Sequence, residues 1–128
     1  MPKKRIFVAD DKEDVLSMLQ DALTAKGFEV KISKDPKEMI KLIKIFQPHL
    51  ILLDLLMPDL DGFDICQILN DGPETQGIPI IIMSGLGDPV DIKRAYKLGV
   101  VDYFTKPFGI GAIVTKIEKA IANKEKPL

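Results

Sequence analysis

Short apolar runs alternate along this chain with longer segments in which apolar residues recur at helical spacing. Runs of strand length that are rich in Ile, Leu and Val predict β-strands, and the segments between them predict amphipathic helices. The predicted strands are Ile6–Ala9, Phe28–Ile32, Leu50–Leu53, Ile78–Met83 and Val100–Phe104. The first, third and fourth runs are apolar without alternation, so we expect them to be central strands with helices on both faces.

The first predicted helix has its apolar residues on one face. Val15, Leu16, Leu19 and Leu23 form this stripe, and Gly27 follows as a C′ residue that ends the helix. The other predicted helices are Pro36–Gln47, Phe63–Asn70, Pro89–Leu98 and a last one with Ile110, Ile113, Val114, Ile117 and Ile121 on one face. Five strands thus alternate with five helices, which predicts an α/β fold with an open, doubly wound parallel sheet in the order 2-1-3-4-5.

Length and composition fit one globular domain, because the chain has 128 residues of which 46% are hydrophobic. We expect this domain to span residues 1–123 and a polar tail to follow at 124–128. The chain has 18 basic and 19 acidic residues, and its net charge of −1 gives no general attraction to nucleic acid or anionic lipid. We therefore expect no direct nucleic-acid binding. No apolar run is long enough to cross a membrane.

The chain has a single cysteine and a single histidine. Cys66 cannot form an internal disulfide, and its surroundings lack the spacing of a zinc site, which fits a reducing, cytoplasmic setting. We expect Cys66 to be a core residue of the third helix rather than a redox switch. His49 precedes the third strand, so we expect it at the edge of the sheet opposite the candidate site.

Polar residues follow four of the predicted strands at the point where each strand ends. They are Asp10-Asp11 after the first strand, Asp54 after the third, Ser84 after the fourth and Lys106-Pro107 after the fifth. Ligands of doubly wound sheets bind beyond the carboxyl ends of the strands, so these residues are expected to share one site.

Each residue alone has a simpler interpretation. Asp11 could cap the first helix, Asp54 and Ser84 could be turn residues, and Lys106 could be a solvated loop lysine. Together with Asp10, the two other aspartates would repel one another unless a cation lay between them. A water-accessible set of oxygen ligands favours Mg²⁺, and the Lys106 ammonium can balance part of the acidic charge and pair with a phosphoryl oxygen.

The order of several separated motifs resembles that of response-regulator receiver domains over nearly the whole chain. The motifs are Asp10-Asp11, Asp54, Met57-Pro58, Asp61-Gly62, Ser84, Tyr103 and Lys106-Pro107-Phe108. The resemblance implies a flavodoxin-like domain of a two-component phosphorelay that is regulatory rather than enzymatic. Asp54 is then the phosphoacceptor, and its phosphoryl group comes from a phosphohistidine of a histidine kinase or phosphotransfer protein.

The resemblance also implies roles for the other residues. Mg²⁺ is held by Asp11 and Asp54, by Asp10 through a water, and by the backbone carbonyl of Leu56. Lys106 and Ser84 assist phosphoryl transfer.

For the switch, Ser84 moves to the phosphoryl group and Tyr103 turns inward. The Lys106-Pro107 peptide bond is expected to be cis. A downstream target or a second receiver is expected at the face formed by the fourth helix, fifth strand and fifth helix.

Two other functions stay open. A metal-dependent phosphatase with an aspartyl intermediate would place its nucleophile after the first strand with a second Asp two residues on, a spacing that Asp10-Asp11-Lys12 lacks. Turnover of phosphate esters would reveal it. A receiver-like module that binds partners without phosphorylation is the other alternative, and a response that depends on Asp54 would exclude it.

Two leucines bear on the lifetime of a phosphoryl group. Leu56 lies two residues after Asp54, and Leu86 lies two after Ser84. Neither side chain can orient a water molecule, so we expect slow self-dephosphorylation.

Overall fold

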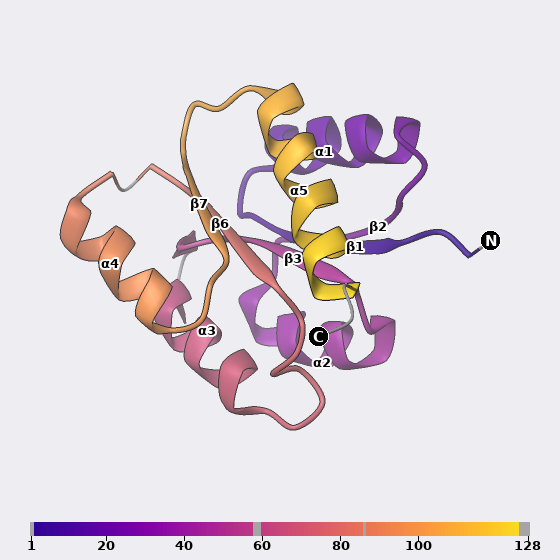
Figure 1. Cartoon of the computed structure of the whole chain (residues 1–128). Coiled ribbons are helices and arrows are strands. Elements are labelled where there is room, and N and C mark those ends of the chain that lie inside the picture. The colour runs from indigo at the N-terminus through magenta and orange to yellow at the C-terminus, as the bar shows by residue number, and fades with distance from the viewer. Residues whose placement is uncertain (1, 58–59, 86, 126–128) are drawn as a thin grey trace.

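The computed structural model describes residues 2–57, 60–85 and 87–125. Its main sheet is parallel and has five strands among these residues, in the order β2-β1-β3-β6-β7 (Figure 1). The strands are β1 (Arg5–Ala9), β2 (Glu29–Ser33), β3 (Leu50–Asp54), β6 (Ile80–Ser84) and β7 (Asp102–Thr105). This order corresponds to the predicted 2-1-3-4-5, and the apolar strands β1, β3 and β6 are central as predicted.

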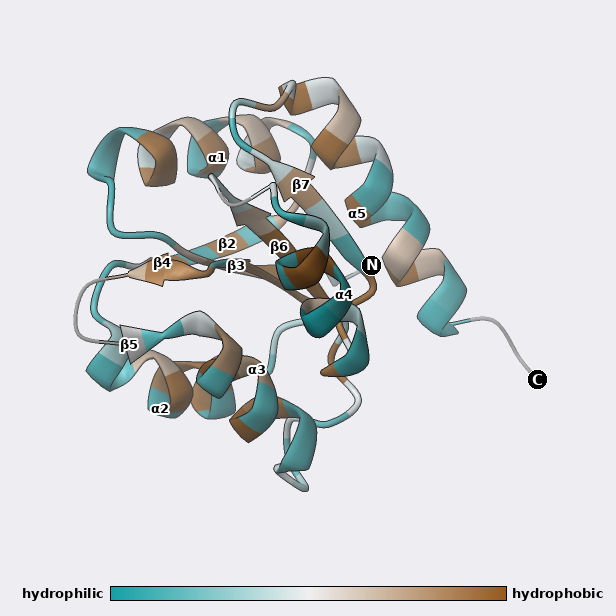
Figure 2. Ribbon diagram, turned by 90° about the vertical axis from the view of Figure 1, so that its left-hand side faces the viewer, coloured by the Kyte–Doolittle hydropathy of each residue, from teal (hydrophilic) through white to brown (hydrophobic). Residues whose placement is uncertain are grey.

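Helices cover both faces of the sheet, which makes the fold doubly wound. Within the described part of the chain they are α1 (Glu13–Ala25), α2 (Pro36–Phe46), α3 (Gly62–Asp71), α4 (Pro89–Lys97) and α5 (Ile110–Glu125). Buried residues of α1 and α5 pack on one face, and those of α2, α3 and α4 pack on the other. Figure 2 shows α1 and α5 on one side of the sheet and α2 and α3 on the other.

Local signals explain where several helices begin and end. Asp35, Asp61 and Asp88 are the N-cap residues of α2, α3 and α4, and each carboxylate accepts a backbone N–H two residues on, at 2.8 to 2.9 Å. These bonds satisfy donors that a helix leaves unpaired in its first turn. After α1, Gly27 adopts a φ of 95°, the left-handed conformation expected of a C′ glycine.

Three strands begin later than predicted, and β1 and β3 each extend one residue beyond their predicted bounds, to Arg5 and Asp54. The Phe28 N–H donates to the Leu23 carbonyl and completes the end of α1, so β2 begins at Glu29. The Ile78 N–H donates to the Thr75 carbonyl in a turn, and β6 begins at Ile80. The last strand likewise begins later than predicted, at Asp102. Apolar residues that lead into a strand are not distinguished from strand residues by hydropathy alone.

Two further differences concern short segments. Helix α5 continues through Lys124 and Glu125, where we expected a polar tail, and residues 126–128 lie outside the described residues. An antiparallel ribbon of β4 (Leu56–Met57) and β5 (Leu60–Asp61), which the sequence did not predict, directly follows β3. Pro58 and Leu86, both named in the sequence analysis, also lie outside the described residues. Of the helices described, none is long and apolar enough to span a lipid bilayer.

Candidate functional site

Three carboxylates meet where two neighbouring central strands end. Asp10 and Asp11 follow β1, and Asp54 is the last residue of β3. Ala9 pairs with Leu53 in the parallel ladder, so the two strand ends lie side by side. One oxygen of each aspartate lies within 4.8 Å of the others. Asp10 and Asp54 are buried, whereas Asp11 is half-buried.

Lys106 is the cation of this cluster. Its Nζ atom lies 2.7 Å from Asp10 Oδ2 and 3.2 Å from Asp54 Oδ2. The lysine follows β7, and its backbone N–H donates to the Ser84 carbonyl at 2.7 Å, which fixes the loop against the end of β6. The Lys106–Pro107 peptide bond is cis, the geometry that the family resemblance implied. Four loops that are distant in sequence thus supply one site.

Each buried carboxylate divides its oxygens between the backbone and Lys106. Asp10 Oδ1 accepts the Lys12 N–H at 2.9 Å, and Asp54 Oδ1 accepts the Leu56 N–H at the same distance. In both residues Oδ2 faces the ammonium. The backbone bonds hold the orientation of the carboxylates, and the second oxygens are directed to the space that a charged ligand would enter.

The electrostatics of the site favour binding of a cation. Burial raises the pKa of Asp54, and the charge of Asp10 raises it further, against the opposing effects of the Leu56 N–H and Lys106. Burial alone would lower the pKa of Lys106, but its hydrogen bond to Asp10 and the charges of Asp54 and Asp10 outweigh burial and raise it. The lysine therefore stays charged, while Asp54 carries a charge that burial disfavours.

The donor set fits Mg²⁺. Every side-chain donor is a carboxylate oxygen, the ligand that this hard cation prefers, and Asp11 is partly exposed to the solvent from which Mg²⁺ retains water ligands. Clustered carboxylates with a single lysine leave an excess of negative charge, which a divalent cation offsets. The residues that could hold the ion are Asp10, Asp11, Asp54 and the carbonyl of Leu56.

Ser84 and Tyr103 lie beside the cluster. Ser84 ends β6 and is fully buried, and Tyr103 lies on the adjacent strand β7 and is half-buried. Their strands pair in the sheet, and the Ser84 hydroxyl lies near the Tyr103 phenol. Burial raises the pKa of the Tyr103 phenol, as do the charges of Asp91 and Asp54, while the nearby Ser84 hydroxyl opposes this rise. Tyr103 is therefore close enough to the acidic cluster for the charge of Asp54 to act on its phenol.

Asp11, Cys66 and His49 have the following places in the structure. The N-cap of α1 is Lys12, without a side-chain capping bond, so Asp11 does not cap that helix. Cys66 is fully buried in the core, and burial raises its pKa to about 12, as expected for a structural thiol. His49 precedes β3, and its Nδ1 accepts the Arg5 N–H at the start of β1, at the opposite end of these strands from the acidic cluster.

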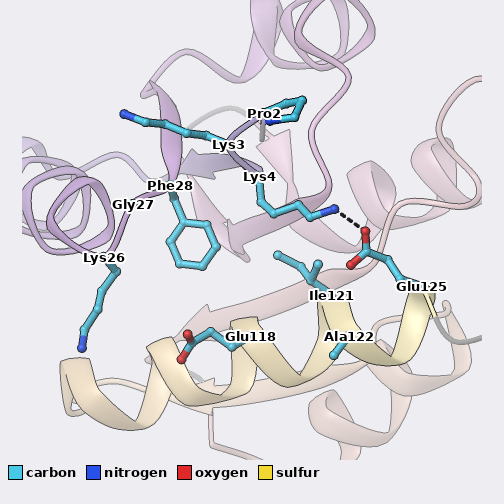
Figure 3. Close-up of a pocket in the computed structure, with 10 residues that line it drawn as sticks. All are labelled: Pro2, Lys3, Lys4, Lys26, Gly27, Phe28, Glu118, Ile121, Ala122 and Glu125. Carbon is cyan, nitrogen blue, oxygen red and sulfur yellow. Dashed lines mark hydrogen bonds and ion pairs between the residues drawn. The ribbon is translucent and has the colours of Figure 1, made fainter.

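One cavity of the described structure lies away from these carboxylates. Figure 3 shows it between the N-terminal segment, the turn before β2 and the end of α5, with Phe28 and Ile121 among its lining residues. Its volume is about 430 Å³, and an ion pair between Lys4 and Glu125 closes one side. None of the acidic cluster lines it. This cavity is therefore separate from the candidate site.

The fold and the site together define a class of protein: a doubly wound α/β domain with an acidic pocket and a paired lysine at the carboxyl end of its sheet. The family model of the response regulator receiver domain matches residues 6–118. The chain belongs to this family, which serves two-component signalling.

Similar proteins support this assignment. "Probable transcriptional regulator ycf27" of Cyanophora paradoxa is 34% identical over 98% of this chain and 51% of its own length. DNA-binding response regulator MtrA of Mycolicibacterium smegmatis is 29% identical over 96% of this chain and 53% of its own. The Francisella response regulator 1452 receiver domain has a TM-score of 0.89 and 27% identity, over 96% of this chain and 100% of that one.

These relatives correct one expectation. The chain spans about half the length of the curated relatives it matches, and MtrA is named a DNA-binding response regulator. Our exclusion of nucleic acid as a direct partner was therefore wrong. It rested on the net charge of −1, and the charge of a receiver domain carries no information about a DNA-binding part elsewhere in a regulator.

Proposed function

We propose that this domain accepts a phosphoryl group on Asp54 in a Mg²⁺-dependent transfer from a phosphohistidine of a histidine kinase or phosphotransfer protein. The observation that carries the proposal is the position of Lys106, which lies within 3.2 Å of Oδ2 of both Asp10 and Asp54. A lysine in this position balances the carboxylates before transfer and is near the phosphoryl oxygens after it.

In the proposed reaction Asp54 Oδ2 attacks phosphorus while the Leu56 N–H holds Oδ1 at 2.9 Å. A P–O bond forms as the N–P bond of the donor breaks, and the donor imidazole leaves with the electron pair and takes up a proton. Lys106 shifts its hydrogen bonds from the carboxylates to a phosphoryl oxygen. Mg²⁺ bound by Asp10, Asp11, Asp54 and the Leu56 carbonyl would offset negative charge on that group. Positioning and charge neutralisation account for most of catalysis in such transfers.

The signal would leave the site through Ser84 and Tyr103. The Ser84 hydroxyl, which lies near the Tyr103 phenol, would donate to a phosphoryl oxygen, and the tyrosine would follow it inward. The added charge gives the two arrangements different free energies, which any shift of population requires. In this proposal Lys106 and Ser84 assist the phosphorylation of the domain's own Asp54. The domain does not turn over a small substrate as an enzyme would.

We also infer that the output of this signal is control of transcription. The support is the naming of matched relatives as a transcriptional regulator and as a DNA-binding response regulator.

The test is reaction with acetyl phosphate, measured by intact-protein mass with and without Mg²⁺. Wild type should gain one phosphoryl group only when Mg²⁺ is present, and Asp54→Ala should gain none. Asp102→Ala removes a carboxylate from the adjacent strand β7 and should behave as wild type. Equal labelling of wild type and Asp54→Ala would overturn the proposal. Multiple turnover of a phosphate ester would favour the phosphatase alternative.

A further inference from the structure

We propose that Gly62 is a positioning residue for the metal and phosphoacceptor site, because its lack of a side chain lets α3 begin against the backbone that joins Asp54 to Leu56. The inference rests on the proposed function. Gly62 is not itself a metal ligand. It would act on the site through its contact with Leu55, the residue between Asp54 and Leu56.

The evidence is a close approach between two backbone segments. A Cβ atom added to Gly62 would lie 2.5 Å from Leu55 Cα and 2.9 Å from both the carbonyl oxygen and Cδ2 of Leu55. Cβ contacts below 3.0 Å are essentially never adopted. Two of the three atoms belong to the backbone, so a change of the Leu55 rotamer cannot relieve the collision.

Space, rather than backbone conformation, requires glycine at this position. Among the described residues, the glycines with left-handed φ are Gly27 and Gly99, at 95° and 92°. Gly62 is not among them, and it lies in the first turn of α3, where alanine has the better helix propensity. An alanine at position 62 would therefore be favoured locally and excluded only by Leu55.

Neither partner of this contact can move easily. Leu55 is 3% exposed and packs in the core, and its carbonyl accepts the Gly62 N–H at 3.2 Å. The ribbon joins the same segments through the pairing of Leu56 with Asp61. Asp61 also accepts the Phe63 N–H at 2.8 Å as the N-cap of α3. A methyl group at position 62 would thus displace Leu55 rather than fit beside it.

Displacement of Leu55 would change the site, because its neighbours in the chain are Asp54, with its carboxylate, and Leu56, with its backbone N–H and carbonyl. The Leu56 N–H holds Asp54 Oδ1 at 2.9 Å, and the carbonyl of Leu56 is the backbone ligand of the proposed Mg²⁺ site. Groups that orient metal ligands from outside the coordination sphere commonly change metal affinity by about 10- to 100-fold when altered. Gly62 is expected to act at the lower end of that range.

The experiment is a Mg²⁺ titration of the full chain in which backbone-amide NMR signals report binding. The chain has no tryptophan whose fluorescence could serve instead. Gly62→Ala should weaken Mg²⁺ binding about tenfold relative to wild type. The matched control is Gly111→Ala, also in the first turn of a helix, where an added Cβ has no neighbour within 4 Å. It should bind Mg²⁺ as wild type does.

Phosphorylation by acetyl phosphate gives a second readout that simple loss of stability would not produce. In Gly62→Ala the Mg²⁺ concentration for half-maximal rate should rise about tenfold, while the rate at saturating Mg²⁺ stays near that of wild type. A variant that is only partly folded loses its maximal rate instead. That result, or Mg²⁺ affinity equal to wild type, would overturn the inference.

A second pair of variants decides the matter if Gly62→Ala does not fold. Asp61→Ala removes the N-cap that holds the start of α3, whereas Asp61→Asn keeps an acceptor and removes the charge. Mg²⁺ binding should be weaker in Asp61→Ala than in Asp61→Asn. Asp35→Ala, which removes the equivalent cap of α2, should leave it unchanged. Equal Mg²⁺ affinity of the two Asp61 variants would refute the proposal that the start of α3, held against Leu55, positions the metal site. Failure of wild type to bind Mg²⁺ would instead refute the proposed function.

Discussion

Lys106 Nζ lies closer to Asp10 Oδ2, at 2.7 Å, than to Asp54 Oδ2, at 3.2 Å. The ammonium is therefore held mainly by the carboxylate at the end of β1, although Asp54 is the proposed phosphoacceptor. This arrangement makes the lysine a counter-ion that occupies the oxygens to which a metal ion would bind. Lysine and Mg²⁺ thus stabilise the same carboxylates, and each should reduce the contribution of the other.

Replacement of Lys106 tests this competition. Lys106→Met leaves the fully buried Asp10 carboxylate without its cation, so the free energy of unfolding without Mg²⁺ should fall by about 3 kcal/mol. Mg²⁺ should then stabilise the variant more than it stabilises wild type, because a ligand stabilises the folded state according to its affinity. Urea unfolding with and without Mg²⁺ measures both effects.

Lys116→Met is the matched control. Lys116 pairs with Asp102 at 3.5 Å and is 47% exposed, so its removal should change the unfolding free energy by less than about 1 kcal/mol, with or without Mg²⁺. An equal Mg²⁺ effect on Lys106→Met and wild type would show that lysine and metal do not compete.

Leu56 should prolong the phosphorylated state. Its side chain is 52% exposed next to the phosphoacceptor, yet it offers no group that could align an attacking water. Leu56→Asn introduces such a group and should shorten the lifetime of phospho-Asp54 at least about tenfold, a small part of the effect that general-base assistance can have. Decay of the phosphorylated band on a phosphate-affinity gel measures this lifetime.

Ile68→Asn provides the comparison for this prediction, because Ile68 is also half-exposed, at 50%, but lies on α3 away from the carboxylates. Its phosphoryl lifetime should equal that of wild type. Complete decay of the wild-type phosphoprotein within seconds in Mg²⁺ would contradict the role assigned to Leu56.

The stability of the domain should depend on the protonation of His49. Its Nδ1 accepts the Arg5 N–H at 2.9 Å, which requires a neutral ring. Burial lowers the pKa of His49 below its ordinary value of 6.5, and the charges of Arg5 and Lys4 lower it further, against the opposing charge of Glu125. The unfolded chain therefore binds a proton at a higher pH than the folded one, and His49 contributes stability above pH 6.5 that is lost as the pH falls through the folded-state pKa.

His49→Asn should remove this component, since an amide oxygen can accept the Arg5 N–H without titrating. The expected result is a smaller loss of unfolding free energy between neutral and mildly acidic pH than in wild type, measured by urea unfolding across the pH range. Parallel pH profiles for the two proteins would show that His49 does not titrate on unfolding.

Much of the fold followed from the sequence because burial leaves a regular pattern. Strands β1, β3 and β6 are covered on both faces, and their uninterrupted apolar runs indicated both their existence and their central place. The short ribbon of β4 and β5 could not be predicted in this way. It lies outside the sheet, and its strands of two residues are shorter than any period of hydropathy.

The candidate site, too, was predicted from the sequence only in part. The sequence by itself determined which residues follow the strand ends, because parallel strands bring their carboxyl ends to one edge, and so it identified Asp10, Asp54 and Lys106 together. Only the tertiary structure decided that Lys106 lies nearer to Asp10 and that Gly62 meets the backbone of Leu55. Both are distances between atoms that are set by packing of separate loops, and packing depends on the whole chain rather than on the order of residues along any segment.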